Sequence, residues 1–277
     1  MNIILSKFSG YCYGVKRAIS IAQNSIGELG KVYSLGSIIH NKRAVEKLEN
    51  QGLQIVDDID KDYKNILFRS HGVEKKFYNF ANEHGMNIID TTCTFVKKIH
   101  QIVADKYKSG NEIIIIGNKS HPEVIGINSW CDYTAQFVGD EKDVEKLKID
   151  KNCNYVLVFQ TTFNIEKYEK IVSKISEKTE NLEIFNTICN ATKKRQDAIL
   201  EISEKVDMIV VIGDKSSSNS KKLYELASSR CKSIFVEDCS ELDQSMFENV
   251  KNVGITAGAS TPDFVIDEVI KYIQDLN

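Results

Sequence analysis

Short apolar runs alternate with longer helical patterns along the whole chain. Segments such as 112–116 and 207–212 are rich in isoleucine and valine, as buried strands are, and segments with apolar residues at helical spacing follow them. This alternation predicts βαβ units with parallel sheets, which is the α/β class. Ligands of such sheets bind at the carboxyl ends of the strands, so residues just past those ends are the functional candidates.

One supersecondary pattern occurs three times. Cys12, Cys93 and Cys189 open the similar segments CYGVKR, CTFVKK and CNATKK, and a glycine follows each cysteine after 24 residues, at positions 36, 117 and 213. We therefore predict three similar small α/β units in a pseudo-threefold, trefoil-like arrangement around a central cluster. Their predicted bounds are 13–92, 93–188 and 189–277, and the strand within 1–12 is expected to pack against the third unit.

Polar residues recur at the predicted strand ends. Four residues after each shared glycine comes His40, His121 or Ser217, which together form a second row beside the cysteines. The fourth strand of each unit leads to a third row of His71, Thr161 and Ser260. The second row has further polar neighbours, namely Asn41, Glu123, Ser218 and Asn219. If the units converge, three thiols lie within a ring of imidazoles, hydroxyls, amides and one carboxylate.

The three repeated thiols are suited to a metal centre. Each lies between a strand end and a helix start, where the helix dipole favours the thiolate. Three thiolates suit zinc or an iron–sulfur cluster, and a set of three leaves one coordination position open. Packing alone is the alternative, but it does not account for repetition in register with polar neighbours.

The remaining strand-end residues suggest an anion site with a proton donor. The segment KSSSNS at 215–220 precedes a helical pattern, and helix N-termini with serine hydroxyls bind phosphate, although such a segment is often only a helix cap. The three histidines at 40, 71 and 121 can add charge-assisted hydrogen bonds. Glu123 is either a proton donor beside a redox centre or a first-turn acid that stabilises the helix dipole.

Composition narrows the class of protein. The net charge of −3 argues against nucleic-acid binding, and no apolar run reaches the length of a membrane span. The N-terminal segment lacks the features of a signal peptide, so we expect a cytoplasmic protein. The four cysteines outside the repeat are expected to pack as small apolar residues: Cys131, Cys153, Cys231 and Cys239. His84 and His100 lie outside the repeat and are expected at the surface.

The motifs, in order and spacing, resemble those of the LytB/IspH family of 4-hydroxy-3-methylbut-2-enyl diphosphate reductases. The similarity runs from about residue 9 to residue 265 and rests on eight motifs: GYCYGVKRAI, RSHGV, DTTCTFVKK, HPEV, QTT, TICNATKKRQ, KSSSNS and TAGAS. One departure from the family pattern is Ile125, where an acidic residue is often found. It leaves Glu123 in place.

The resemblance implies a trefoil of α/β units around a [4Fe–4S] cluster with three cysteine ligands, Cys12, Cys93 and Cys189, and one open iron. It implies the last step of the methylerythritol phosphate route, the two-electron reductive removal of an allylic hydroxyl to give isopentenyl and dimethylallyl diphosphates. Glu123 would deliver the proton, aided by Thr161 and His121. The diphosphate would be held by His40, His71, His121, Ser217, Ser218, Asn219 and Ser260, with Thr161 also at the substrate.

The implied electron donor is reduced ferredoxin or flavodoxin. Basic pairs follow each repeated cysteine, at 16/17, 97/98 and 193/194, where the helix dipole disfavours cations. They are candidates for docking an acidic donor, and solvated helix faces or ion pairs between units are the plainer alternative.

Two other functions fit the same residues. The first is a zinc-dependent phosphate-ester hydrolase with Glu123 as the base, and the second is a non-catalytic sensor that binds a cluster or a diphosphate. Colour separates zinc from iron–sulfur, and turnover separates an enzyme from a sensor.

Overall fold

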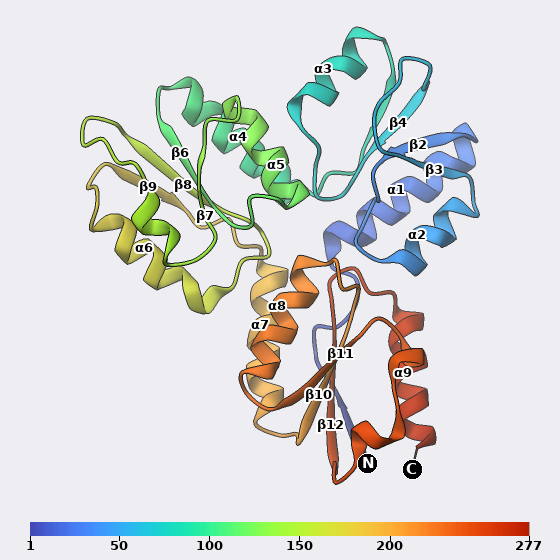
Figure 1. The fold of residues 1–277 in the computed structure, drawn as a ribbon. Coiled ribbons are helices and arrows are strands. Elements are labelled where there is room, and N and C mark those ends of the chain that lie inside the picture. Colours follow the sequence, from blue (N-terminus) through green and yellow to red (C-terminus); the bar gives the residue numbers. More distant parts are fainter. Residues whose placement is uncertain (277) are drawn as a thin grey trace. The chain divides into compact units, whose positions relative to one another are not determined.

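The computed structural model describes residues 1–276, which contain three parallel four-stranded sheets (Figure 1). Sheet A has the order β1 (Asn2–Leu5), β12 (Asn252–Ala257), β10 (Met208–Ile212) and β11 (Lys232–Val236). Sheet B has the order β3 (Leu53–Val56), β2 (Val32–Leu35), β4 (Asn65–Phe68) and β5 (Asn87–Asp90). Sheet C has the order β7 (Gln136–Val138), β6 (Glu112–Ile116), β8 (Tyr155–Phe159) and β9 (Leu182–Phe185). The predicted α/β class is confirmed.

Helices connect these strands at the predicted places. They are α1 (Tyr13–Leu29), α2 (Lys42–Glu49), α3 (Lys75–Glu83), α4 (Thr94–Lys108), α5 (Pro122–Asn128), α6 (Tyr168–Ser176), α7 (Asn190–Ser203), α8 (Ser218–Ser228) and α9 (Asp263–Asp275). Short 3₁₀ turns, which the apolar pattern did not predict, lie at Ser129–Cys131, Asp143–Lys146, Ile165–Lys167, Cys239–Glu241 and Gln244–Phe247. Such turns span too few residues to produce a helical hydrophobic period.

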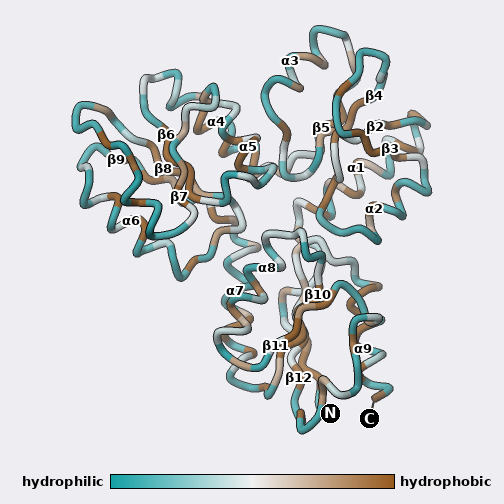
Figure 2. The backbone as a smooth tube through the Cα atoms, in the orientation of Figure 1, coloured by the Kyte–Doolittle hydropathy of each residue, from teal (hydrophilic) through white to brown (hydrophobic). Residues whose placement is uncertain are grey.

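Alternate residues of the central strands face opposite helical layers. In sheet A, Met208, Val210 and Ile212 pack with residues of α9, whereas Ile209 and Val211 pack with residues of α7 and α8. In sheet C, the even-numbered isoleucines of β6 pack with α6 and the odd-numbered ones with α4 and α5. Figure 2 shows the hydrophobic residues concentrated in these strands. Both faces of sheets A and C are covered, which is why their central strands are continuously apolar.

The strand order is the same in all three sheets. Each cysteine of the repeat follows an edge strand: Cys12 follows β1, Cys93 follows β5, and Cys189 follows β9. The next strand inward leads to a third-row residue, and the one after that leads to a second-row residue. Because the strands are parallel, each sheet has these three strand ends on one edge.

The N-terminal strand β1 pairs in parallel with β12, with Asn2 opposite Asn252 and Leu5 opposite Ile255. By compactness the chain divides into two units: residues 1–16, 39–47 and 190–277 form the first, and residues 17–38 and 48–189 form the second. The first unit holds sheet A, and the second holds sheets B and C. The bounds 13–92, 93–188 and 189–277, and the trefoil arrangement, stay predictions.

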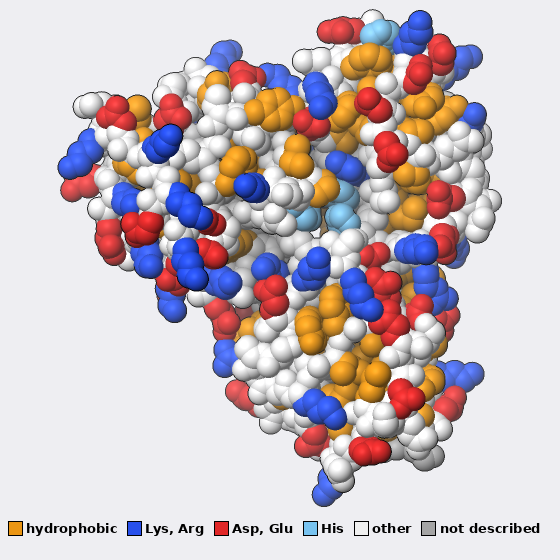
Figure 3. All heavy atoms as spheres, in the orientation of Figure 1, with side chains coloured by type: hydrophobic (Ala, Val, Ile, Leu, Met, Phe, Trp, Pro, Cys, Tyr) orange, Lys and Arg blue, Asp and Glu red, His pale blue; other side chains and the backbone are white. Residues whose placement is uncertain are grey.

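Charged side chains of both signs are interspersed over the surface seen in Figure 3. Several form ion pairs, such as Lys174 with Glu141 and Lys178 with Glu145, each at 3.2 Å. Among residues 1–276, none of the helices is both long and apolar enough to cross a membrane.

Candidate functional site

Each repeated cysteine is held by an equivalent main-chain hydrogen bond. The N–H of Cys93 donates to Ser70 O at 2.8 Å, that of Cys189 to Thr161 O at 3.0 Å, and that of Cys12 to Ala259 O at 3.0 Å. Each acceptor lies two residues past the end of the neighbouring strand, at 68, 159 and 257. Thr161 is therefore equivalent to Ser70 and Ala259. The predicted third row, which aligned it with His71 and Ser260, is out of register by one residue there.

Each of these cysteines also precedes a helix, as predicted. Cys93 caps α4, and Cys12 and Cys189 come directly before α1 and α7. The Cys12 Sγ accepts a hydrogen bond from Val15 N at 3.5 Å, so this thiol lies over the open N–H groups of the first turn. None of these three thiols forms a disulfide, and each is partly exposed.

Glu123 and Thr161 are joined by two short hydrogen bonds. Glu123 lies in the first turn of α5 and is only 3% exposed. Its Oε1 accepts from Thr161 N at 2.6 Å and its Oε2 from Thr161 Oγ1 at 2.7 Å. Burial raises the pKa of Glu123 to about 7 and outweighs the two Thr161 hydrogen bonds, which lower it. A carboxyl group with this pKa can hold and release a proton near neutral pH.

Ionisation of Glu123 is expected to make stability depend on pH. The unfolded chain releases this proton near pH 4.5, whereas the folded protein keeps it until about pH 7. The folded state binds more protons between these values, so its stability falls as the pH rises through this window, by about 3 kcal/mol. Urea unfolding from about pH 4 to about pH 8 measures how the difference in free energy of unfolding between the wild type and Glu123→Gln changes with pH. A difference that stays constant across the range contradicts the raised pKa.

His121 lies beside this pair and has a defined tautomer. It caps α5, and its Nδ1 accepts a hydrogen bond from Glu123 N at 3.1 Å. This bond uses the Nδ1 lone pair, so the proton of the neutral imidazole lies on Nε2, where it can be donated to a ligand. The ring of His71 lies edge-on to it, with centroids 6.2 Å apart. Sheets B and C thus bring two of the predicted histidines together.

The remaining candidates lie in the first compact unit. Ser217 caps α8 and accepts from Ser220 N at 3.3 Å, and the segment Ser217–Asn219 lies at the start of that helix. The buried Nδ2 of Asn219 has no hydrogen-bond partner among residues 1–276, as expected for a group that meets a ligand. Ser260 Oγ donates to His40 O at 2.6 Å, so the structure brings these two predicted residues together.

The shared glycine has a packing reason. A Cβ at Gly117 would lie 2.7 Å from Gln160 Cβ, and one at Gly213 would lie 2.3 Å from Ser220 Oγ. Both distances are too short for any side chain to fit without a shift of its neighbours. The glycine repeats because the loop after each second strand passes close to its neighbours.

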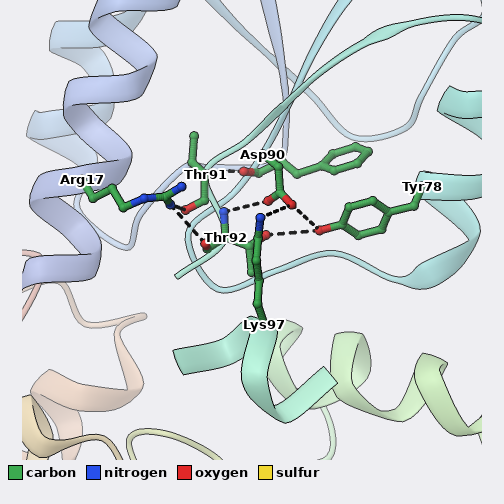
Figure 4. Close-up of polar contacts among 7 residues, drawn as sticks. Arg17, Tyr78, Asp90, Thr91, Thr92 and Lys97 are labelled. Atoms are coloured by element: carbon green, nitrogen blue, oxygen red, sulfur yellow. Dashed lines mark hydrogen bonds and ion pairs between the residues drawn. The ribbon is translucent and has the colours of Figure 1, made fainter. Parts of the chain in front are cut away.

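The loop before Cys93 contains a polar network that the sequence reasoning missed (Figure 4). Asp90 accepts from Thr92 N at 2.9 Å and from Tyr78 Oη at 3.1 Å, and it pairs with Lys97 at 2.7 Å. Burial alone would raise the pKa of Asp90, but the hydrogen bonds from Lys97 and Thr92 hold it below its ordinary value. Arg17 donates to the carbonyls of Thr91 and Thr92 at 3.4 and 3.2 Å. The sequence did contain a signal for this network, namely basic residues in the first turn of a helix, where the helix dipole disfavours a positive charge.

A family model described as "LytB protein" matches residues 3–274. This chain belongs to the LytB family. Relatives named 4-hydroxy-3-methylbut-2-enyl diphosphate reductase include one from Clostridioides difficile, 43% identical over 279 residues and 100% of both chains. Another, from Clostridium perfringens, is 41% identical over 283 residues and 99% of each chain.

Two solved structures also resemble this LytB-family chain. The E-1-hydroxy-2-methyl-but-2-enyl-4-diphosphate reductase from Plasmodium falciparum matches with a TM-score of 0.93 and 31% identity, over 99% of this chain and 87% of that one. A second structure, titled (E)-4-hydroxy-3-methyl-but-2-enyl diphosphate reductase, the terminal enzyme of the non-mevalonate pathway, matches with a TM-score of 0.70 and 34% identity. It covers 99% of this chain and 100% of that one.

His100 of this LytB-family chain corrects one prediction. It is buried, not at the surface, and its ring stacks on Trp130 with centroids 5.4 Å apart. Burial lowers the pKa of His100 to about 4, so the imidazole is neutral at neutral pH. A Cβ at Gly72 would lie 2.9 Å from its ring, which shows how closely it packs behind the His71 loop. His84 is exposed, as predicted.

The four cysteines outside the repeat take part in hydrophobic packing, as predicted, with Cys131 buried and the other three partly exposed. Cys131 Sγ donates to Asn128 O at 3.3 Å, and burial raises the pKa of this thiol to about 11. Cys153, Cys231 and Cys239 each pack against a hydrophobic cluster. Within residues 1–276 no group of three His, Cys, Asp or Glu side chains is placed as a metal site. The convergence of the three repeated cysteines stays a prediction.

Proposed function

We propose that this LytB-family chain is a 4-hydroxy-3-methylbut-2-enyl diphosphate reductase, which yields isopentenyl and dimethylallyl diphosphates as the last step of the methylerythritol phosphate route. Two electrons and two protons are consumed: the allylic C–O bond breaks, the hydroxyl leaves as water, and a C–H bond forms.

Relatives with this name match over 99–100% of the chain. The observation that carries the proposal is the buried Glu123 bound twice by Thr161, whose carbonyl holds the Cys189 loop.

Cys12, Cys93 and Cys189 would hold a [4Fe–4S] cluster with one open iron. These three residues fit the group because they are partly exposed thiols outside disulfides, and each directly precedes a helix. Of the other four cysteines, Cys131 is buried, and Cys153, Cys231 and Cys239 pack against hydrophobic clusters. When bound, such a cluster supplies single electrons and a Lewis-acidic iron. The remaining chemistry falls to the side chains around it.

Glu123 delivers the proton with which the hydroxyl leaves as water. Its raised pKa means that the carboxyl is protonated in a large share of molecules at neutral pH. Thr161 Oγ1, at 2.7 Å, is placed to pass this proton on or to orient the carboxyl group. His121 offers its Nε2–H to the ligand while its Nδ1 keeps the cap on α5.

The diphosphate is bound by imidazole, hydroxyl and amide donors at the strand ends. The residues are His40, His71, His121, Ser217, Ser218, Asn219 and Ser260. The start of α8 contributes main-chain N–H groups beside the Asn219 amide, which suits an anion. Thr161 also contacts the substrate, beside Glu123.

A reductase needs an electron donor, and reduced ferredoxin or flavodoxin is the donor we assign. Of the basic pairs considered for docking, Arg17 and Lys97 already have partners within the chain, and Lys194 lies 5.4 Å over the Phe8 ring. The exposed Lys16, Lys98 and Lys193 are the better candidates for meeting an acidic donor.

Anaerobic purification followed by one combined measurement tests the function. We expect a brown protein with about four irons and four sulfides per chain and a broad absorbance near roughly 400 nm. With a strong reductant it should convert the hydroxylated diphosphate into the two products. A colourless zinc protein that releases phosphate indicates the hydrolase instead, and a cluster protein without turnover indicates the sensor. Either outcome overturns the proposal.

A further inference from the structure

Arg17 holds the main chain directly before Cys93. Its Nη1 donates to both Thr91 O and Thr92 O, and Thr91 and Thr92 are fully buried (Figure 4). The amides of this loop are paired as well: Thr91 N donates to Phe68 O at 3.0 Å and Cys93 N to Ser70 O at 2.8 Å. The guanidinium therefore binds the two carbonyls of a loop whose N–H groups are already used.

Arg195 holds the main chain just before Cys12 in a similar way. Its Nη2 donates to Gly10 O at 2.5 Å and its Nη1 to Ala191 O at 3.0 Å, and the side chain is only 5% exposed. Gly10 has a left-handed φ of 80°, and a Cβ there would lie 2.9 Å from Asp263 Oδ1. A residue with a side chain would be strained at this φ, and the Arg195 guanidinium bonds to the carbonyl of the turn.

The two contacts share one design. Each arginine lies in the helix that follows one of the repeated cysteines: Arg17 comes five residues after Cys12, and Arg195 comes six residues after Cys189. Each binds main-chain carbonyls that lie within two residues before a different repeated cysteine, which is Cys93 for Arg17 and Cys12 for Arg195. A cation in the first turns of a helix is disfavoured by the dipole, and hydrogen bonds to carbonyl oxygens offset this. Asp90 and Lys97 neutralise each other, so Arg17 is not needed there as a counter-ion.

We propose that Arg17 and Arg195 are positioning residues that hold the loops of Cys93 and Cys12 in the conformation that presents their thiols. The purpose of this positioning rests on the proposed role of the cysteines as cluster ligands. The loop conformation itself can be measured whether or not the cysteines have that role. The guanidinium forms charge-assisted bonds to main-chain carbonyls, which a neutral amide cannot replace at the same length.

Hydrogen exchange of Arg17→Gln, followed by mass spectrometry on anaerobically purified protein, is the test. The amides of Thr91, Thr92 and Cys93 should exchange about 10-fold faster or more, because the carbonyls beside them lose a charged donor. Amides of β6 should be unchanged. Arg17→Lys, which keeps a charged donor, should restore part of the protection. Arg195→Lys, chosen because a neutral residue there could prevent folding, should speed exchange at Cys12 only.

Lys16→Gln is the matched control, since it removes the same charge one position earlier from an exposed side chain. It should leave exchange at residues 91–93 at the wild-type rate. A chelator should remove iron faster from Arg17→Gln than from this control. Unchanged exchange in Arg17→Gln, or equal acceleration in β6, overturns the inference. Faster local exchange in a protein that never binds iron would leave the inference standing and reject the proposed function.

Discussion

Glu123→Gln is expected to lower turnover by about 10²- to 10⁴-fold, with its iron content unchanged. Glutamine is nearly isosteric and its amide oxygen can still accept from Thr161 N, which bonds the wild-type carboxylate at 2.6 Å. What it lacks is a proton that can be transferred. Because burial raises the pKa of Glu123 to about 7, this carboxyl group can supply a proton at neutral pH. The measurement is steady-state turnover under excess reductant, normalised to iron.

Glu112→Gln is the control for this experiment. Glu112 lies at the opposite end of β6, on the same sheet, and is exposed to solvent. It should keep wild-type turnover, because the change removes a carboxyl group from the same sheet but far from the strand ends. Near wild-type turnover in fully loaded Glu123→Gln would remove this residue as the proton source. A neighbouring hydroxyl or water would then have to fill that role.

Serine at position 12, 93 or 189 is expected to remove most of the iron and reduce turnover to the background of the assay. A hydroxyl is a harder and much less acidic ligand than a thiol, so it does not hold an iron–sulfur cluster in the same way. Each variant should still fold, since these cysteines are partly exposed and serine keeps the main-chain N–H that donates to the neighbouring loop. Iron and sulfide content, together with the absorbance spectrum, measures the loss.

The other four cysteines provide matched controls within the same chain. Serine at 153, 231 or 239 replaces a thiol packed against a hydrophobic cluster, and serine at 131 keeps a donor to Asn128 O. These variants can lose stability, but they should retain iron and turnover. Iron bound normally by any of the three repeat variants would mean that its cysteine is not a ligand. Iron lost from one of the four controls would point to a different ligand set.

The repeated strand and helix pattern could be predicted because it is local. The central strands of sheets A and C are continuous apolar runs covered on both faces, and the helices that cover them have apolar stripes, so both leave a pattern in the sequence. The 3₁₀ turns leave no such period. The alignment of Thr161 with His71 was wrong for a related reason. A loop that is one residue longer or shorter does not change the sequence pattern, and the difference became apparent only when the main-chain hydrogen bonds of the three cysteines were compared.

The environment of single side chains could not be predicted in the same way. Glu123 has the same place in sequence whether it is a surface cap or a buried acid, and its 3% exposure decides between the two. His100 was expected at the surface because it has no repeat partner, yet the ring fills space behind Gly72. Arg17 was grouped with exposed cations, although it binds carbonyls that are 74 and 75 residues away in the chain.

By itself the sequence determined the α/β class, the strands and helices, and the repetition of a thiol between a strand end and a helix start. These follow from periodicity and spacing, which are properties of neighbouring residues. Only the tertiary structure decided that Glu123 is buried with Thr161, that the Nδ1 of His121 accepts from Glu123 N, and that Arg17 and Arg195 bind the cysteine loops. Burial and hydrogen bonding depend on residues distant in the chain, and these set the pKa values and positions on which the chemistry depends.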